Sequence, residues 1–265
     1  MKIKKILTLG LFLTVMVVGV SCTKGDNSNV DSTDAKDNGE ILVGAAASLT
    51  DALNEVKPIF EDKENCVVNF TYAASGTLQK QIEEDGGIDV FISASEDKMN
   101  NLVEKNLIED DTLFPVLKNT LVLITNKESD DGITLDNLTT KANKIAIGQP
   151  DVVPAGQYAK QSLENLNMWN EIQEKYVFAK DVRAVLAYVS TGESEAGFVY
   201  KSDASIDENV QIVEELKDDL HDPIVYPGAV VKSSENKELS KKFLDFLKED
   251  EAKEILTKYG FSLND

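Results

Sequence analysis

Hydrophobic residues follow two different spacings along the chain, and each spacing predicts one kind of element. Apolar residues three and four positions apart are typical of a helix, and the segment that opens at Ser48 continues in this way with Leu49, Leu53, Val56 and Phe60. Shorter, nearly continuous apolar runs are typical of buried strands. The two spacings alternate along most of the chain, which predicts an α/β fold with parallel βαβ units.

The expected strands cover the ranges 41–43, 67–72, 88–93, 119–125, 144–148, 175–179, 196–200 and 209–213, with an extended segment over 223–231. The expected helices begin near residues 48, 75, 96, 135, 155, 182 and 237, and a last helical turn reaches residue 259. At 265 residues the chain is longer than an average domain. α/β chains of this length often divide into two lobes.

Four of the expected helices begin in loops of small residues or shortly after a proline. Their first residues are Ser48, Ser75, Ala155 and Val182. A serine at such a position can simply cap its helix. The first turn of a helix also leaves backbone N–H groups without partners, and the helix dipole favours an anion there. Because loops that follow the strands of an open sheet gather at one edge, four such helix starts predict an anion site.

Composition limits the partners of the protein. The formal net charge is −20, and hydrophobic residues make up 42% of the chain. This charge argues against binding to nucleic acid or to an anionic membrane surface, and taken alone it favours a cationic partner. An anion site in this chain must therefore depend on local neutral donors.

The first residues predict export. Three lysines precede an apolar run that ends at Ser21 and Cys22, which is the pattern of a signal peptide over residues 1–21. Cys22 resembles the lipidated cysteine of a bacterial lipobox, although Gly19 stands where that motif usually has an aliphatic residue. A plain signal peptide or an uncleaved anchor is the alternative. Residues 22–39 are polar and predict a disordered linker.

Cysteine and histidine are too rare for several kinds of site. Cys66 is the only cysteine besides Cys22, so no disulfide framework is expected, and the surrounding sequence indicates a buried strand residue. His221 is the single histidine, which excludes a cysteine- or histidine-rich metal site. Two serines and one histidine raise the alternative of a secreted serine hydrolase. The chain lacks a G-x-S-x-G motif, and His221 falls far from the serine helices.

Five segments, in the same order, resemble the molybdate-binding protein of bacterial ABC transporters. They read AAASLTDAL, ASGTLQKQI, IDVFISA, VPAGQYAK and DVRAVLAYVSTGESEAGFVYKSDA. The resemblance extends over about residues 40–265. It implies that a tetrahedral oxyanion is held by Ser48 and Ser75, by the amides of Ala155 and Val182, and by the Tyr200 hydroxyl. No direct cation ligand is implied, because molybdenum would enter only as the oxyanion.

The resemblance also implies a type II periplasmic-binding-protein fold, with two α/β lobes of mixed, mainly parallel sheets. One lobe would hold residues 40–119 and 226–265, and the other residues 120–225. Crossing strands near 119–123 and 223–226 would form the hinge. In this arrangement Asp181 is expected to be an N-cap, and Arg183 a surface or lobe-contact residue.

The function implied is that of the solute-binding component of a molybdate importer, and not an enzyme. The protein would need no cofactor, bind molybdate or tungstate, act as a monomer anchored outside the cell membrane by its lipid, and deliver its ligand to an ABC permease. Phosphate is disfavoured because a protonated phosphate needs an acceptor in the site. A preference for tungstate or sulfate stays open, since cavity size would decide it.

Overall fold

The structure is a computed structural model that describes residues 39–129 and 132–263. The predicted signal peptide, Cys22 and nearly all of the predicted linker lie outside these residues. Within the described ranges, no helix has the length and apolar character needed to cross a membrane.

One sheet has six strands in the order β11-β4-β10-β3-β1-β2. Its strands are β1 (Glu40–Ala46), β2 (Val67–Ala73), β3 (Val90–Ile92), β4 (Phe114–Lys118), β10 (Val225–Val230) and β11 (Ser262–Leu263). The second sheet has five strands in the order β7-β6-β8-β5-β9. Its strands are β5 (Leu121–Asn126), β6 (Ile145–Gly148), β7 (Tyr176–Ala179), β8 (Ala196–Tyr200) and β9 (Val210–Glu215).

Helices connect and cover these strands. The α-helices are α1 (Thr50–Glu64), α2 (Ser75–Glu83), α3 (Glu96–Glu104), α4 (Leu138–Lys141), α5 (Pro154–Asn165), α6 (Val182–Ser190), α7 (Lys201–Ala204), α8 (Lys237–Phe246) and α9 (Asp250–Lys258). The 3-10 turns are η1 (Ala47–Leu49), η2 (Asp110–Thr112), η3 (Leu135–Asn137), η4 (Gln173–Lys175) and η5 (Asp218–Leu220).

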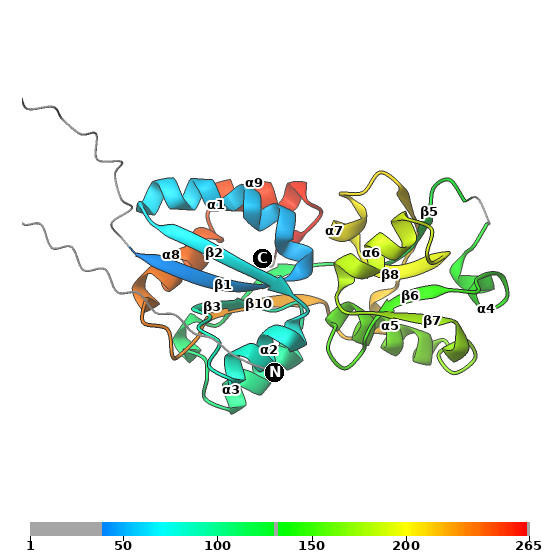
Figure 1. The fold of residues 1–265 in the computed structure, drawn as a ribbon, viewed down its shortest axis with the longest axis horizontal. Helices are drawn as coiled ribbons and strands as arrows, with labels where there is room; N and C mark the ends of the chain where they lie inside the picture. The colour runs from blue at the N-terminus through cyan, green and yellow to red at the C-terminus, as the bar shows by residue number, and fades with distance from the viewer. Residues whose placement is uncertain (1–38, 130–131, 264–265) are drawn as a thin grey trace, which may run out of the picture. The chain divides into compact units, whose positions relative to one another are not determined.

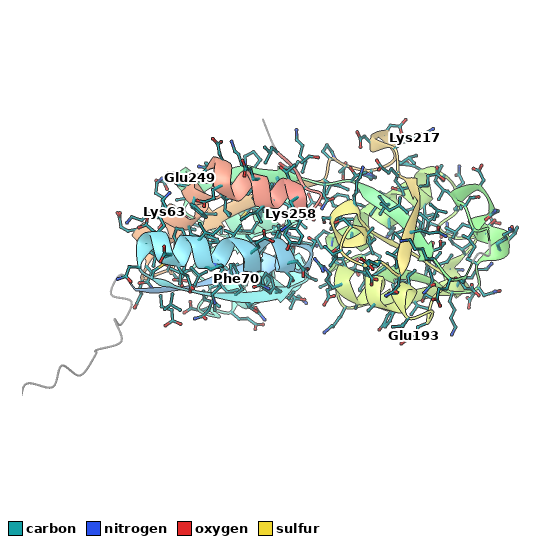
Figure 2. All side chains as sticks on the ribbon, turned by 90° about the horizontal axis from the view of Figure 1, so that it is seen from above. Lys63, Phe70, Glu193, Lys217, Glu249 and Lys258 are labelled. Carbon is teal, nitrogen blue, oxygen red and sulfur yellow. The ribbon has the colours of Figure 1, made fainter. Side chains whose placement is uncertain are left out.

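Helices cover both faces of the six-stranded sheet. α1 and α9 lie side by side on one face, and α2 and α3 on the other (Figure 1). On the first face Phe60 of α1 packs edge-on against Phe243 of α8, with ring centroids 5.2 Å apart. The outer surfaces carry charged side chains, and Lys63 of α1 pairs there with Glu249, the residue before α9 (Figure 2). The buried layers on the two faces therefore sandwich the sheet.

The sheets are mixed, as predicted. Among the described strands, four pairings are parallel and five are antiparallel, so parallel pairs do not predominate. The antiparallel pairs of the six-stranded sheet involve β10 and β11, with which the chain returns to it, and those of the five-stranded sheet involve β5, its first strand in the chain.

The strand β4 was not expected from the sequence pattern. Proline cannot donate a ladder hydrogen bond and is rare inside sheets, which hides the strand FPVLK. In the structure Pro115 lies opposite Pro227 at an irregular register between β4 and β10. The irregularity accommodates both prolines, and the expected interruption at Pro227 does not end β10.

The chain passes between the two sheets twice. Residues 119–120 connect β4 to β5, and residues 216–224 connect β9 to β10. Between these passages, residues 121–215 contribute all strands of the five-stranded sheet.

A close approach of two glycines positions the start of α5. A Cβ added at Gly156 would lie 1.9 Å from the Gly148 carbonyl oxygen at the end of β6. No side chain fits in that space, so glycine at position 156 is what lets the first turn of α5 pack against the strand.

Gly156→Ala is expected to destabilise the protein by about 2 kcal/mol, because the backbone must separate to admit a methyl group. Denaturant unfolding would measure the change. Lys160→Ala, on the same helix, is the control and should change the free energy of unfolding by less than about 0.5 kcal/mol. Equal stabilities of Gly156→Ala and the unsubstituted protein would show that α5 can shift without cost.

Candidate functional site

A small cavity lies where four helices begin. Its lining comprises Ala46, Ala47, Ser48, Ala73, Ala74, Ser75, Ala94, Val153, Pro154, Ala155, Val182 and Tyr200. All five residues that the sequence singled out are among them. The centre of a water molecule can reach about 10 Å³ of this space, which is roughly the minimum for one water molecule.

The helices that begin at the cavity lack side-chain caps at three of their four starts. The N-cap residues are Ala46 before η1, Ala74 before α2 and Val153 before α5, and none of these side chains can accept a hydrogen bond. First-turn N–H groups have no acceptor within their own helix. Their positive dipole ends therefore converge on one small space.

The fourth helix start, that of α6, does have a side-chain cap. Asp181 accepts a hydrogen bond from the Ala184 N–H at 2.8 Å, which confirms it as the N-cap of α6. The bond uses the third N–H of the helix and not that of Val182. Val182 and Ala155 both line the cavity and lie in the first turns of α6 and α5.

Ser48 is not the N-cap that its sequence position suggested. It lies inside the turn η1, and α1 begins two residues later at Thr50. Its hydroxyl lies 2.9 Å from the Tyr226 hydroxyl instead of bonding to a first-turn amide. Ser75 is the first residue of α2, and its hydroxyl accepts a hydrogen bond from the Ala94 N–H at 2.9 Å.

Tyr200 ends β8, as predicted, and lines the cavity from the five-stranded sheet. Its hydroxyl is buried, and among the described residues the hydroxyl that interacts with it is that of Tyr226. Burial, followed by the nearby Tyr226, raises the pKa of Tyr200 well above its usual value. The phenol therefore keeps its proton at physiological pH and is available as a donor.

The cavity is neutral although the protein is strongly acidic. Its described lining contains only alanine, serine, valine, proline and tyrosine. The polar side-chain groups of this lining are hydroxyls, which can donate to a guest that only accepts hydrogen bonds. Such a guest would be held by oriented dipoles at close range, without a charged partner.

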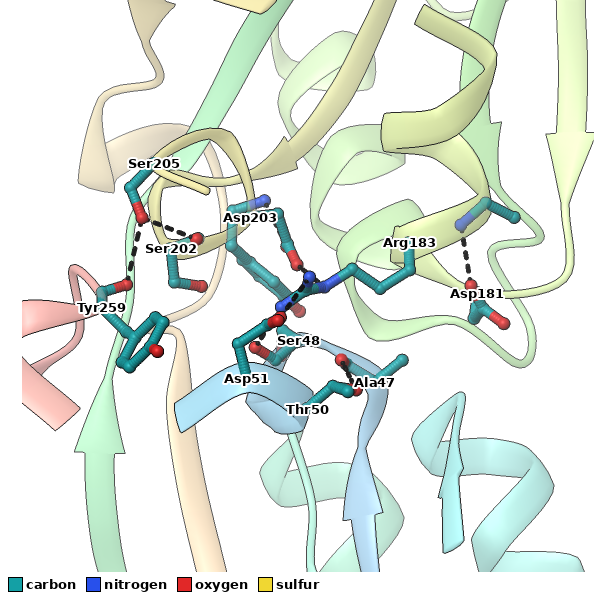
Figure 3. A network of polar contacts seen from close by, with 12 residues as sticks. Ala47, Ser48, Thr50, Asp51, Asp181, Arg183, Ser202, Asp203, Ser205 and Tyr259 are labelled. Atoms are coloured by element: carbon teal, nitrogen blue, oxygen red, sulfur yellow. Dashed lines mark hydrogen bonds and ion pairs between the residues drawn. The ribbon is translucent and has the colours of Figure 1, made fainter. Parts of the chain in front are cut away.

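The nearest cation to this lining, Arg183, follows Val182 and joins groups from both sheets (Figure 3). Its guanidinium forms ion pairs of 2.7 Å with Asp51 of α1 and with Asp203 of α7. It also donates to the Ser48 carbonyl oxygen at 3.0 Å. Two carboxylates neutralise this cation. Because one carboxylate belongs to α1 and the other to α7, Arg183 forms the predicted contact between the two sides.

Asp203 is fully buried, and its carboxylate also accepts from the Tyr200 N–H at 3.2 Å. Burial raises the pKa of Asp203 from the usual 3.8 to about 6, and the Arg183 charge opposes the rise. Arg183 is therefore what allows this carboxylate to be ionised above pH 6.

Backbone and polar contacts join the two sheets around the cavity. The Gly76 N–H donates to the Val152 carbonyl at 3.0 Å, and a Cβ at Gly76 would lie 2.7 Å from that oxygen. Lys98 donates to the Asp151 carbonyl at 2.9 Å. These contacts hold the start of α2 against the loop before α5.

The other sequence candidates lie outside the cavity lining. His221 bonds through Nδ1 to the Asp222 carbonyl, and in the described part of the chain neither cavity serine bonds to it. Cys66 is buried, as expected, but it lies immediately before β2 and not within the strand. No cluster of three or more His, Cys, Asp or Glu residues that could hold a metal ion occurs among residues 39–129 and 132–263.

Sequence reasoning missed the residues whose hydrogen bonds hold the cavity-lining residues in place. Tyr226, Asn119 and Asp203 bond to cavity residues or to one another. Tyr226 and Asn119 lie outside the five segments that carry the resemblance, and Asp203 lies in the last of them but was not singled out. The only available signal was their polar character next to apolar runs.

Comparisons with known proteins agree with this geometry. The family model described as bacterial extracellular solute-binding protein matches residues 41–262. YvgL of Bacillus subtilis (strain 168), named as a candidate ABC transporter substrate-binding lipoprotein, is 41% identical over 239 residues, which are 90% of this chain and 92% of that protein. The molybdate-binding protein ModA of Haemophilus influenzae is 39% identical over 232 residues, which are 84% of this chain and 90% of that protein.

A solved structure is also similar. It is the substrate-binding domain of a candidate molybdenum ABC transporter from Clostridium difficile, with a TM-score of 0.67 and 39% identity over 86% of this chain and 100% of that chain. Fold and cavity together define a solute-binding protein with the type II periplasmic-binding-protein fold, which confirms the predicted fold class. The chain belongs to the family of bacterial extracellular solute-binding proteins.

Arg183→Met is expected to destabilise the protein in a pH-dependent way. Between about pH 4 and 6 the folded state holds a proton on Asp203 that the unfolded state has lost, so the free energy of unfolding falls as the pH rises through this window. Without Arg183 the pKa of Asp203 rises further and the cost of ionising it grows. We expect a loss of about 3 kcal/mol at pH 8 and a smaller loss at pH 5, measured by denaturant unfolding.

Asp51→Asn is the matched control, since it removes only the more exposed partner of Arg183. It should cost about 0 to 1 kcal/mol, equally at both pH values. A loss from Arg183→Met that is the same at pH 5 and pH 8 would contradict the role assigned to Asp203.

Proposed function

We propose that this protein captures molybdate or tungstate outside the cell and delivers it to an ABC permease. The observation that supports the proposal is a small cavity without charged side chains, lined by residues from the starts of four helices and by one tyrosine. A tetrahedral dianion offers only acceptors and suits this lining. The name of the Haemophilus influenzae relative, a molybdate-binding protein, supports the choice of ligand.

The proposed ligand contacts are five. Ser48 and Ser75 donate from hydroxyl and backbone N–H groups on the six-stranded side, and the amides of Ala155 and Val182 donate from the other. Tyr200 adds its phenol, whose hydroxyl is buried at the cavity. The protein needs no cofactor for this task and is a transport protein, not an enzyme.

The same lining should bind some classes of anion better than others. Hydrogen phosphate carries a proton that needs an acceptor, and the described lining contains no carboxylate. Molybdate, tungstate and sulfate are fully deprotonated near neutral pH and fit the donors equally well by charge. Size then selects among them, so molybdate and tungstate, which are nearly equal in size, should both bind.

Binding from both sides would couple the ligand to closure. We assign residues 40–119 and 226–265 to one lobe and residues 120–225 to the other, with the two crossings as the hinge. A ligand that contacts both lobes stabilises the closed form, which a permease can distinguish from the open one. The protein acts as a monomer in this scheme, with no nucleic acid partner.

Ser48→Ala and Ser75→Ala are each expected to weaken molybdate binding by about tenfold or more. Loss of one hydrogen bond to a charged ligand costs roughly 1.5 to 3 kcal/mol. Isothermal titration calorimetry would measure both affinities, and competition with tungstate, sulfate and phosphate would give the order of preference. Ser162→Ala is the control, because this buried serine bonds only within α5. Unchanged affinity in both cavity variants would refute the site.

We propose that Cys22 carries the lipid that retains the protein at the membrane. The name of the Bacillus subtilis relative, a lipoprotein, supports this. Cys22→Ala should release the protein from the membrane fraction into the medium and abolish labelling by a radioactive fatty acid, while Cys66→Ala should do neither. Membrane retention of the Cys22→Ala protein would indicate an uncleaved anchor instead.

A further inference from the structure

A chain of hydrogen bonds leads from the crossing between the sheets to Ser48. The Ser48 hydroxyl lies 2.9 Å from the Tyr226 hydroxyl, and the Asn119 amide nitrogen lies 3.2 Å from the same Tyr226 oxygen. Ser48 and Tyr226 are both buried. Of these three residues, only Ser48 lines the cavity.

The direction of the first bond follows from the surroundings of Asn119. Its side-chain oxygen accepts from the Thr120 N–H at 2.9 Å, which fixes the orientation of the amide. The nitrogen end then donates to the Ser202 hydroxyl at 2.8 Å and to the Tyr226 hydroxyl. Tyr226 is therefore an acceptor toward Asn119.

The direction of the second bond follows from the first. Tyr226 has one proton, and burial raises its pKa well above the usual value, so the proton stays on the phenol. The Ser48 oxygen lies 2.9 Å from this hydroxyl and can accept its proton. Tyr226 then donates to Ser48, and the proton of Ser48 is left for the cavity.

The Ser75 hydroxyl is oriented in the same direction, as a donor to the cavity, but by a different group. Its oxygen accepts from the Ala94 N–H at 2.9 Å, so its proton is also available to a guest. In both serines a donor from the protein occupies one acceptor position of the hydroxyl. The two hydroxyls thus face the cavity as donors.

We propose that Asn119 and Tyr226 are positioning residues that orient the Ser48 hydroxyl as a donor to the bound anion. The inference rests on the proposed function and deepens it, because an oriented Ser48 also offers less acceptor capacity to a protonated oxyanion. Asn119 stands at the first crossing between the sheets, and Tyr226 near the start of the strand that follows the second. The orientation of a ligand group is therefore linked to the segments proposed as the hinge.

The test is a double-mutant cycle on purified protein, with molybdate affinity measured by calorimetry. Tyr226→Phe keeps a ring that packs against Tyr200 and Phe261 but removes the hydroxyl. It should lower affinity about three- to tenfold in the unsubstituted protein and by the same factor in Ser75→Ala. In Ser48→Ala it should change affinity by less than about twofold, since the group it acts through is gone.

An equal loss from Tyr226→Phe in all three backgrounds would overturn the inference, because a merely structural role of the ring or hydroxyl is additive. Failure of the unsubstituted protein to bind molybdate would instead refute the proposed function. The two failures are therefore distinguishable, and thermal unfolding of each variant confirms that it is folded.

Asn119→Asp gives an independent test. The carboxylate still accepts from the Thr120 N–H but cannot donate to Tyr226, so it draws the Tyr226 proton and turns Ser48 away from the cavity. Affinity should fall by about tenfold, and most of this loss should vanish in Tyr226→Phe, which has no hydroxyl to reorient. A loss of the same size in the Tyr226→Phe background would exclude Asn119 from the relay and indicate direct charge repulsion.

Discussion

Buried N–H groups need acceptors, and this constraint shapes the region between the two sheets. The residues before η1, α2 and α5 are alanine or valine, which cannot cap a helix. At an exposed helix start, water would accept hydrogen bonds from the first-turn N–H groups. Here these groups border a small cavity among buried residues. Leaving them unpaired costs free energy, and a guest with several acceptor oxygens recovers it. Helix starts that would be defects elsewhere thus become the binding groups of the proposed site.

The same constraint explains how an acidic protein can hold an anion. Charge at the surface is screened over about 10 Å, whereas the cavity donors act at contact distance in a desolvated space. Arg183, a cation beside the cavity lining, forms ion pairs with Asp51 and Asp203 and donates a further hydrogen bond to the Ser48 carbonyl. Its role is therefore to hold the residues around the cavity in place, and not to attract the anion.

The element pattern was largely readable from the sequence, because periodicity reports which residues are buried. The helix over 96–104 and the strand over 196–200 match their expected ranges. The strand β4 was not readable, because its proline is acceptable only opposite the irregular register of β10. The direction of strand pairing could not be predicted from the sequence either. Whether a strand pairs parallel or antiparallel depends on the neighbouring strands of the sheet that it joins.

For the site, the sequence by itself determined which residues could serve: small side chains at helix starts, two serines, and a tyrosine at a strand end. These properties are local, so residue type and spacing express them. Only the tertiary structure decided that Ser48, Ser75, Ala155, Val182 and Tyr200 line one cavity, and that Asn119, Tyr226 and Arg183 support it. The partners of Ser48 stand 135 and 178 residues away in the chain. Contacts over such separations are fixed by how the strands pair and the helices pack, which no local pattern encodes.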